Sequence, residues 1–172
     1  KILYAFALAG VLGLSSCSDF LDQTSPSEMT AENTYASPYY TNLRVNKLYG
    51  GMGQDRTYAQ DLSIVWNLNS DCELIDGLGS NATNTSNERG NMNYNMDPGW
   101  SKISGVWDAE YGIIEDANQI IEGIRSSATL TAGGANQKSM ERSLGEALTI
   151  RAMVYFDLVR IFGDIPFKVE AS

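Results

Sequence analysis

The side chains that could do chemistry in this chain are carboxylates and tyrosines, because its 172 residues include no histidine. That absence excludes the Ser-His-Asp and Cys-His catalytic pairs and the commonest zinc sites. The densest acidic group is Asp71, Glu73 and Asp76. Two carboxylates held about 5 to 9.5 Å apart can hydrolyse a glycosidic bond. The alternative, which we favour, is that these three acids cap a preceding helix and begin a loop.

A different chemistry is indicated at Cys17, which follows Leu14-Ser15-Ser16 and a run of thirteen uncharged residues at 2–14. The run is too short to cross a bilayer, which takes roughly 20 apolar residues, and it has the length of a signal-peptide core. Leu-Ser-Ser-Cys resembles a bacterial lipobox, in which cleavage precedes a cysteine lipidated on sulfur. We predict a lipoprotein signal peptide over 1–16 and acyl chains on Cys17 that anchor the protein to a membrane. The alternative is an ordinary secretory signal with a later cleavage site and a free thiol.

Residues 17–36 are predicted to be the lipidated N-terminus and a tether. The stretch from Ser18 to Glu28 is polar and acidic and contains a proline, as flexible linkers do. We assign 37–172 to the folded domain. Because the sequence begins at Lys1 without a methionine, we also expect that part of the signal peptide precedes it.

The charge pattern argues against nucleic acid as a partner. The formal net charge is −9 and the twelve Lys and Arg residues are dispersed, whereas a phosphate-binding protein presents basic clusters. A hydrophobic content of 43% predicts a folded core. Once Cys17 is acylated, Cys72 has no other cysteine with which to pair, so we interpret it as a buried apolar residue rather than a reactive thiol.

The segment 76–98 is rich in Asn, Gly and Ser and is predicted to be one long loop. Connections longer than about 12 to 15 residues without regular structure are uncommon in compact domains and are usually functional or disordered. This segment is therefore the first place to look for binding.

Helices must position that loop, and the spacing of apolar residues predicts four of them, over 37–52, 57–71, 100–124 and 140–162. The first opens with Ser37 as a potential N-cap and Pro38 at the first helical position. In the last two, apolar residues recur every three or four positions, with a break at 126–137. Neither apolar stripe can be hidden from water by its own helix, so these two helices should pair as an antiparallel hairpin.

The last predicted helix stops at Phe162, where Gly163 can act as a C-cap and Pro166 prevents continuation. Arg160 and Asp164 could form a pair across this helix end. Four polar residues of the two long helices are interpreted as structural, with side chains that bond carboxylates or backbone carbonyls nearby: Asn118, Arg151, Asp157 and Arg160.

Two stretches behind the lipobox are similar to the N-terminal part of the SusD/RagB-type outer-membrane lipoproteins of Bacteroidetes. They are WDAEYGIIEDANQIIEGI at 107–124 and GEALTIRAMVYFDLVRIFGDIPF at 145–167. The resemblance covers most of the chain and implies an all-α fold, a tetratricopeptide-like scaffold of helical hairpins with a long irregular Asn/Gly-rich loop. Family members are much longer, so the chain looks like an N-terminal fragment whose further helices would cover apolar surface left exposed by the hairpin.

The resemblance implies a lipoprotein on the cell surface that captures glycans and passes them to a SusC-like TonB-dependent transporter, without catalysis, cofactor or metal. Asp19 and Asp22, directly behind Cys17, partly match the family's signal for export to the surface. In sugar-binding members some contacts come from loops before the Trp-Tyr helix, which here points to Arg89, Asn91, Tyr94, Asn95 and Trp100. Trp100 could instead be the first core residue of its helix. Not every member binds carbohydrate, so a protein- or peptide-binding scaffold is the alternative.

Overall fold

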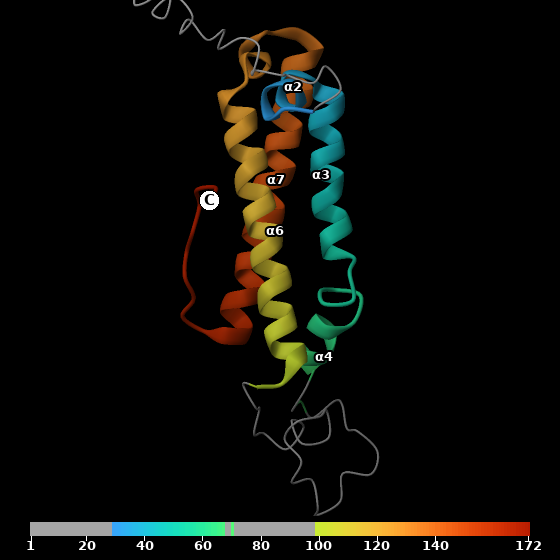
Figure 1. Cartoon of the computed structure of the whole chain (residues 1–172), viewed down its shortest axis with the longest axis vertical. Helices are drawn as coiled ribbons and strands as arrows, with labels where there is room; N and C mark the ends of the chain where they lie inside the picture. Colours follow the sequence, from blue (N-terminus) through green and yellow to red (C-terminus); the bar gives the residue numbers. More distant parts are fainter. Residues whose placement is uncertain (1–28, 68–69, 71–98) are drawn as a thin grey trace, which may run out of the picture. The chain divides into compact units, whose positions relative to one another are not determined.

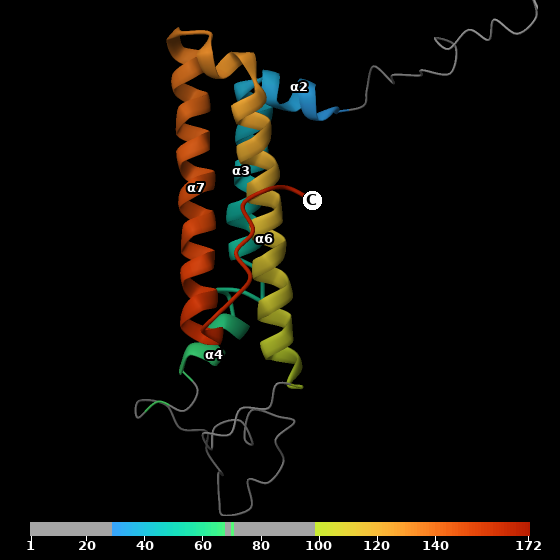
Figure 2. The ribbon, with the colours of Figure 1, turned by 90° about the vertical axis from the view of Figure 1, so that its left-hand side faces the viewer.

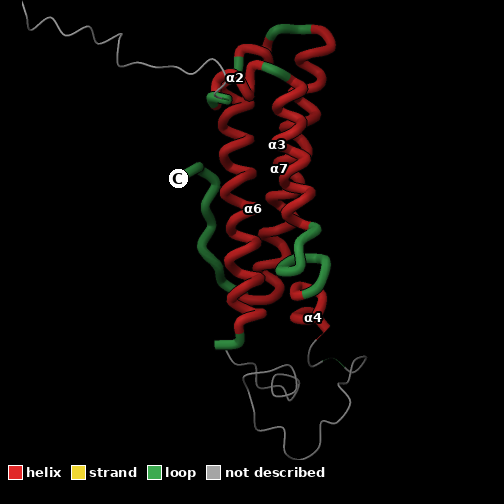
Figure 3. Tube along the Cα trace, turned by 45° about the vertical axis from the view of Figure 1, so that its right-hand side comes forward, coloured by secondary structure: helices red, strands yellow, loops and turns green. Residues whose placement is uncertain are grey.

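The computed structural model describes residues 29–67, 70 and 99–172. Every regular element in these residues is helical, which confirms the all-α prediction (Figures 1 and 3). The elements are α2 (Ala31–Ala36), α3 (Pro38–Met52), α4 (Asp61–Asn67), α6 (Ser101–Ser126), the 3-10 helix η2 (Ala128–Thr131) and α7 (Gly134–Phe162). All of them belong to one compact unit, Ala31–Ser172.

The predicted hairpin of the two long helices is confirmed. Helices α6 and α7 lie antiparallel and side by side, joined by the short connection that contains η2 (Figures 1 and 2). Helix α3 packs against both of them, and α4 contacts the beginning of α6. After α7 the chain turns back in an extended segment along α6 (Figure 2).

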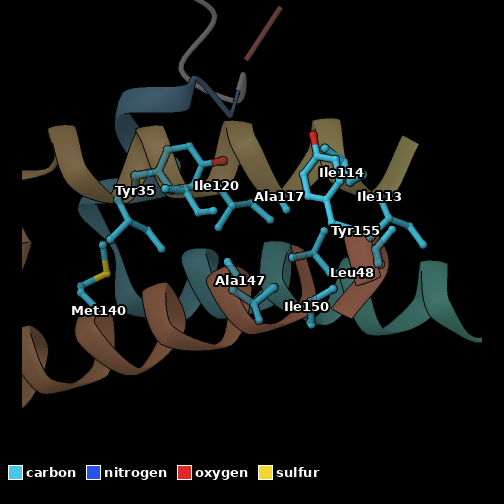
Figure 4. Close-up of a cluster of buried hydrophobic side chains, with 14 of the residues drawn as sticks. Tyr35, Leu48, Ile113, Ile114, Ala117, Ile120, Met140, Ala147, Ile150 and Tyr155 are labelled. Carbon is cyan, nitrogen blue, oxygen red and sulfur yellow. The ribbon is translucent and has the colours of Figure 1, made fainter. Parts of the chain in front are cut away.

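The core lies between α3, α6 and α7, where the apolar stripes meet. Figure 4 shows Ala117 and Ile120 of α6 with Ala147 and Ile150 of α7 and Leu48 of α3 in one cluster. All five side chains are buried. Burial of apolar surface stabilises such a cluster by about 25 cal/mol per Å² removed from water, so the contact that the periodicity predicts is also the main contact that holds the helices together.

Helix α7 begins at Gly134, six residues before the first apolar residue of its predicted stripe. Gly133 and Gly134 have positive φ angles of 81° and 69°, which glycine adopts without strain. The amide oxygen of Gln137 accepts a hydrogen bond from the N–H of Gly133 at 3.0 Å. The first turns of α7 are mostly exposed and polar, so the spacing of apolar residues could not detect them.

The two shorter predicted helices are present with changed bounds. Helix α3 begins at Pro38 behind Ser37, whose backbone is extended but whose side chain forms no capping hydrogen bond. Helix α4 is shorter than the predicted range 57–71 because residues before Asp61 form turns. There the hydroxyl of buried Thr57 lies 2.6 Å from the carbonyl oxygen of Met52, which favours a tight turn over a continued helix.

The predicted tether needs a correction at its end. Residues Ala31–Ala36, the last six of the range 17–36, form α2, and Tyr35 is buried in the core with 7% of its surface exposed. The carbonyl oxygen of Tyr35 accepts a 2.6 Å hydrogen bond from the hydroxyl of Ser127. The carbonyl oxygens of Thr34 and Ala36 also accept bonds, from the hydroxyls of Thr41 and Thr129. The buried Tyr35 ring and these backbone bonds tie the segment to the bundle, a feature that the polar composition before it does not reveal.

The predicted stop of the last helix is confirmed at Gly163. This residue has φ 75° and donates its N–H to the carbonyl oxygen of Val159 at 2.9 Å. We expect Gly163→Ala to lower the free energy of unfolding by about 1–2 kcal/mol, because a Cβ is strained at this positive φ. The control Gly145→Ala lies within α7 and meets nothing within 4 Å, so it should stabilise the helix by up to about 1 kcal/mol. Urea denaturation measures both changes, and equal effects of the two substitutions would contradict the assigned cap.

Candidate functional site

Most residues singled out for binding or chemistry lie outside the described residues. These are Cys17, Cys72, the acids Asp71, Glu73 and Asp76, and the predicted glycan contacts Arg89, Asn91, Tyr94 and Asn95. In the sequence, all of these positions except Cys17 lie in the connection between α4, which ends at Asn67, and α6, which begins at Ser101. The described residues next to this group of positions in the chain are Ser70 and Gly99.

Trp100 is the one predicted contact that the structure describes, and its ring belongs to the core. It is 4% exposed and clusters with buried Leu62, Val65 and Val106. Its burial agrees with the alternative interpretation, a first core residue of α6, and leaves little ring surface for a ligand. The cluster is supplemented by an ion pair between α6 and α4, in which Lys102 Nζ lies 2.6 Å from Asp61 Oδ1.

A buried acidic group lies beside this cluster and links three segments of the chain. The hydroxyl of Tyr58, between α3 and α4, donates to Oδ2 of Asp157 in α7. Glu110 of α6 is fully buried, and among the described residues neither of its carboxylate oxygens has a hydrogen-bond partner. Burial, together with the nearby charge of Asp157, raises the pKa of Glu110 to about 8. At neutral pH Glu110 is therefore predominantly an uncharged acid.

A raised carboxyl pKa next to a second carboxyl also characterises acid–base pairs in glycosidases. Here the side chains of both partners are enclosed, since Glu110 is 0% and Asp157 4% exposed. A substrate in solution has no access to such carboxyls, so we assign the pair to the architecture of the bundle. Glu110 was not singled out from the sequence, although it stands three residues after Trp107 and four before Ile114, at core spacing.

Arg160 lies near the same end of the bundle and contacts aromatic rings. Its guanidinium carbon is 5.1 Å from the ring centre of Trp66 and 5.3 Å from that of Phe156, a cation–π arrangement. Trp66 in turn meets Tyr58 edge-on, with 5.8 Å between ring centres. Arg160 therefore joins α7 to α4 through ring contacts. Within the described residues it does not form the suggested pair with Asp164, and it contacts aromatic rings rather than the carboxylates or carbonyls that were predicted.

A second polar assembly, which we call the clamp, holds the extended segment after α7. It consists of Asn118 in α6 with Arg151 and Tyr155 in α7. The amide nitrogen of Asn118 donates to the carbonyl oxygens of Lys168 and Glu170 at 3.2 and 3.1 Å. Its amide oxygen accepts from Nη1 of Arg151 at 2.7 Å. This confirms that Asn118 and Arg151 are structural.

Tyr155 completes the clamp through its hydroxyl. That oxygen accepts from the N–H of Lys168 at 2.8 Å and donates to the carbonyl oxygen of the same residue at 2.6 Å. Tyr111 donates to the carbonyl oxygen of Pro166 at 2.7 Å, and Arg151 also reaches that of Val169 at 3.2 Å. The clamp thus binds backbone groups of an extended segment. In the sequence, Tyr155 lies on the apolar stripe of its helix. Its phenol oxygen is the signal that it could also form hydrogen bonds, because a buried tyrosine hydroxyl usually has a hydrogen-bond partner.

Comparison with known proteins decides the family. A family model described as "Starch-binding associating with outer membrane", SusD-like, matches residues 19–172. The chain belongs to the SusD-like family. Its all-helical described structure agrees with the fold expected from the resemblance.

Individual relatives carry the same family name. A SusD-like protein P2 of Formosa agariphila is 28% identical over 91% of this chain and 29% of its own length. A SusD-like protein P25 of the same organism is 23% identical over 98% of this chain and 31% of its own length. A SusD-like protein of Bacteroides ovatus is 30% identical over 37% of this chain. No solved structure matches.

The SusD-like chain spans less than a third of the length of the Formosa relatives that it matches. None of its described helices combines the length and apolar character required to cross a membrane. On the exposed face of α7, Met153, Phe156 and Val159 are 44%, 62% and 51% exposed. That further helices cover this surface stays a prediction.

Proposed function

We propose that this chain belongs to a cell-surface lipoprotein that binds glycans and delivers them to a SusC-like TonB-dependent transporter of the outer membrane. The observation that carries the proposal is the match of the starch-binding, outer-membrane family description to residues 19–172. In this proposal the protein acts by binding, without bond cleavage or cofactor. The described acidic pair of Glu110 and Asp157 supports that view, since its burial keeps substrates away from both carboxyls.

Membrane attachment is proposed to occur through lipid on Cys17. The proposal rests on Leu14-Ser15-Ser16 before Cys17 and on the uncharged run at 2–14, and the family match from residue 19 leaves this leader outside the matched domain. We expect Cys17→Ser to leave the protein unlipidated and to move it out of the membrane fraction. Mass spectrometry of the native protein tests this, and an unmodified Cys17 in the mature N-terminal peptide would contradict it.

The glycan contacts are proposed to come from the segment between α4 and α6, with Arg89, Asn91, Tyr94 and Asn95 as contacts and buried Trp100 as an anchor of the adjoining helix. Tyrosine rings pack on sugar faces, while guanidinium and amide groups bond hydroxyls. Tyr94→Ala and Arg89→Ala should each weaken binding of a starch oligosaccharide about tenfold, as loss of a contact of about 1.4 kcal/mol does. Calorimetric titration of the full-length soluble protein is the measurement.

A matched control separates this site from other exposed tyrosines. Tyr40 of α3 is 40% exposed, so Tyr40→Ala should leave the affinity unchanged. An equal loss in Tyr40→Ala and Tyr94→Ala would argue against the proposed contacts. Release of reducing ends from the oligosaccharide during incubation would refute a pure binding function.

A protein- or peptide-binding scaffold is the second candidate, and the clamp is the observation that favours it. The clamp forms hydrogen bonds from Asn118, Arg151 and Tyr155 to the backbone of an extended segment. These bonds do not involve the side chains of that segment. A glycan array and a pull-down from detergent-solubilised outer membrane distinguish the candidates. Glycan binding supports the first, whereas recovery of a transporter without any glycan signal supports the scaffold.

A further inference from the structure

We propose that Glu110, Asp157 and Tyr58 form a proton-dependent latch that fastens the segment from Tyr58 through α4 to the α6–α7 hairpin. The latch joins residues that are far apart in the sequence: Tyr58 and Asp157 are separated by 99 positions. Its three residues are not among the predicted glycan contacts. The inference does not depend on the proposed function.

The geometry requires Glu110 to hold its proton. A buried carboxylate without hydrogen-bond donors is far costlier than the neutral acid, and both oxygens of Glu110 lack partners at 0% exposure. The neighbouring Asp157 is 4% exposed and has the Tyr58 hydroxyl as its donor. Two negative charges in one buried site repel one another, and the charge of Asp157 contributes to the raised pKa of Glu110, so ionisation of one acid disfavours ionisation of the other.

The charged and titratable groups around Glu110 come from each packed element. From α7 these are Asp157 and Arg160, the latter close enough to Asp157 to lower its pKa in part. From the turns before α4 they are Tyr58 and Arg56, whose side chain passes Gly105 of α6. Between α4 and α6 the ion pair of Asp61 with Lys102 is already formed. Burial nevertheless dominates and raises the pKa of both Glu110 and Asp157.

Tyr58 couples the ionisation of the two acids to the packing of α4. Its hydroxyl bonds Asp157, and its ring meets Trp66 of α4 edge-on. Trp66 is also held by Arg160. Ionisation of Glu110 adds a second negative charge beside the Tyr58–Asp157 bond, and solvation of that charge requires water to enter between α6, α7 and the Tyr58 turn. Helix α4 has only seven residues, too few to persist alone, so it should loosen first.

The direction of the pH effect follows from proton linkage. The folded chain binds the Glu110 proton more tightly than the unfolded chain, with a pKa of about 8 against 4.5. The associated stability is complete below the unfolded pKa and is lost as the pH rises through the folded pKa. Between about pH 5 and 8, the folding equilibrium constant should fall about tenfold per pH unit, which corresponds to one proton released on unfolding. Above that window the effect should level off.

Urea denaturation of the full-length protein between pH 5 and 9 tests the latch. The quantity compared at each pH is the folding equilibrium constant of the wild type divided by that of Glu110→Gln. Gln is uncharged and of similar size, so the contributions of the other titrating groups to the two folding constants cancel in the ratio. The ratio should therefore fall about tenfold per pH unit. The matched control is Glu122→Gln, an exposed acid on the same helix, for which the ratio should stay constant. A ratio for Glu110→Gln that does not change with pH would overturn the proposal.

Two further measurements test where the latch acts and whether a proton occupies it. Hydrogen exchange corrected for intrinsic rates should show α4 amides opening at pH 9 in the wild type and staying protected in Glu110→Gln, while amides near Ile120 stay protected in both. Tyr58→Phe, which keeps the ring and removes the hydroxyl, should loosen α4 already at pH 7. Uniform loosening of all helices would overturn the latch.

Stabilisation of the wild type by added Ca²⁺ or Mg²⁺, absent in Glu110→Gln, would assign the acids to a cation and overturn the latch as well.

Discussion

Replacement of Asn118 by alanine should lower the free energy of unfolding by about 2–4 kcal/mol, the sum of three lost hydrogen bonds at about 1 kcal/mol each and an incompletely paired arginine. Asn118 is 1% exposed and bonds the carbonyl oxygens of Lys168 and Glu170 and the guanidinium of Arg151. Chemical denaturation measures the loss. In addition, hydrogen exchange at the amide of Lys168 should accelerate, because the extended segment detaches.

Two variants distinguish the clamp from ordinary packing. Asn118→Asp keeps an acceptor for Arg151 and removes both donors to the backbone, so it should free the extended segment while retaining the contact between α6 and α7. Asn42→Ala removes an exposed amide of α3 whose partner is exposed Asn46, and its effect should stay within about 0.5 kcal/mol. If Asn118→Asp left the exchange at Lys168 unchanged, the assigned role of Asn118 would be wrong.

Gly123→Ala should destabilise the protein by about 1–3 kcal/mol, the usual cost of overfilling a packed contact. A Cβ at this position of α6 would lie 2.2 Å from Cδ2 and Cε2 of Tyr35. The ring of Tyr35 is buried and its backbone is bonded to Ser127, so α2 must move to make room. The measurement is the urea midpoint together with the exchange of α2 amides.

The same helix provides a control of opposite sign. Gly112→Ala meets nothing within 4 Å and should stabilise α6 by about 0.5–1 kcal/mol through helix propensity. In a double-mutant cycle, Tyr35→Ala should remove most of the cost of Gly123→Ala, because the atoms that clash are gone. Independent, additive effects of these two substitutions would show that α2 does not pack on Gly123.

The clamp and the latch lie on different parts of the α6–α7 hairpin and use it differently. The clamp joins Asn118 to residues about 50 positions later in the chain, and it guides the backbone that leaves α7. The latch joins α7 to α4 through Tyr58, beside the buried Glu110 of α6. Because they share no residue, we expect Asn118→Ala and Glu110→Gln to change stability additively. The hairpin of α6 and α7 thereby holds the extended segment after α7 through the clamp, and the segment from Tyr58 through α4 through the latch.

The positions of the helices follow from the sequence more closely than the residues at which they begin and end. The stripe of α6 and the stop at Gly163 were visible because periodicity and a glycine–proline pair are local signals. The start of α7 at Gly134 was not visible, since its first turns are polar and since Gly133 and Gly134, with positive φ, form the turn that precedes them. For the candidate site, Trp100 had two interpretations in the sequence, a glycan contact or a first core residue, and its packing with Leu62 and Val106 assigned it to the core.

The amino-acid sequence by itself determined the helical class, the pairing of two long amphipathic helices and the family, because each depends on residue types at short, regular separations. Only the tertiary structure decided which polar side chains lie together and which backbone groups they bind. Glu110 became a neutral acid through its burial between the helices and, to a smaller extent, through the charge of Asp157, and Tyr155 became a backbone ligand through the return of Lys168. Ionisation and hydrogen bonding depend on the solvent and charges that folding brings around a side chain, and these are set by contacts that no local pattern encodes.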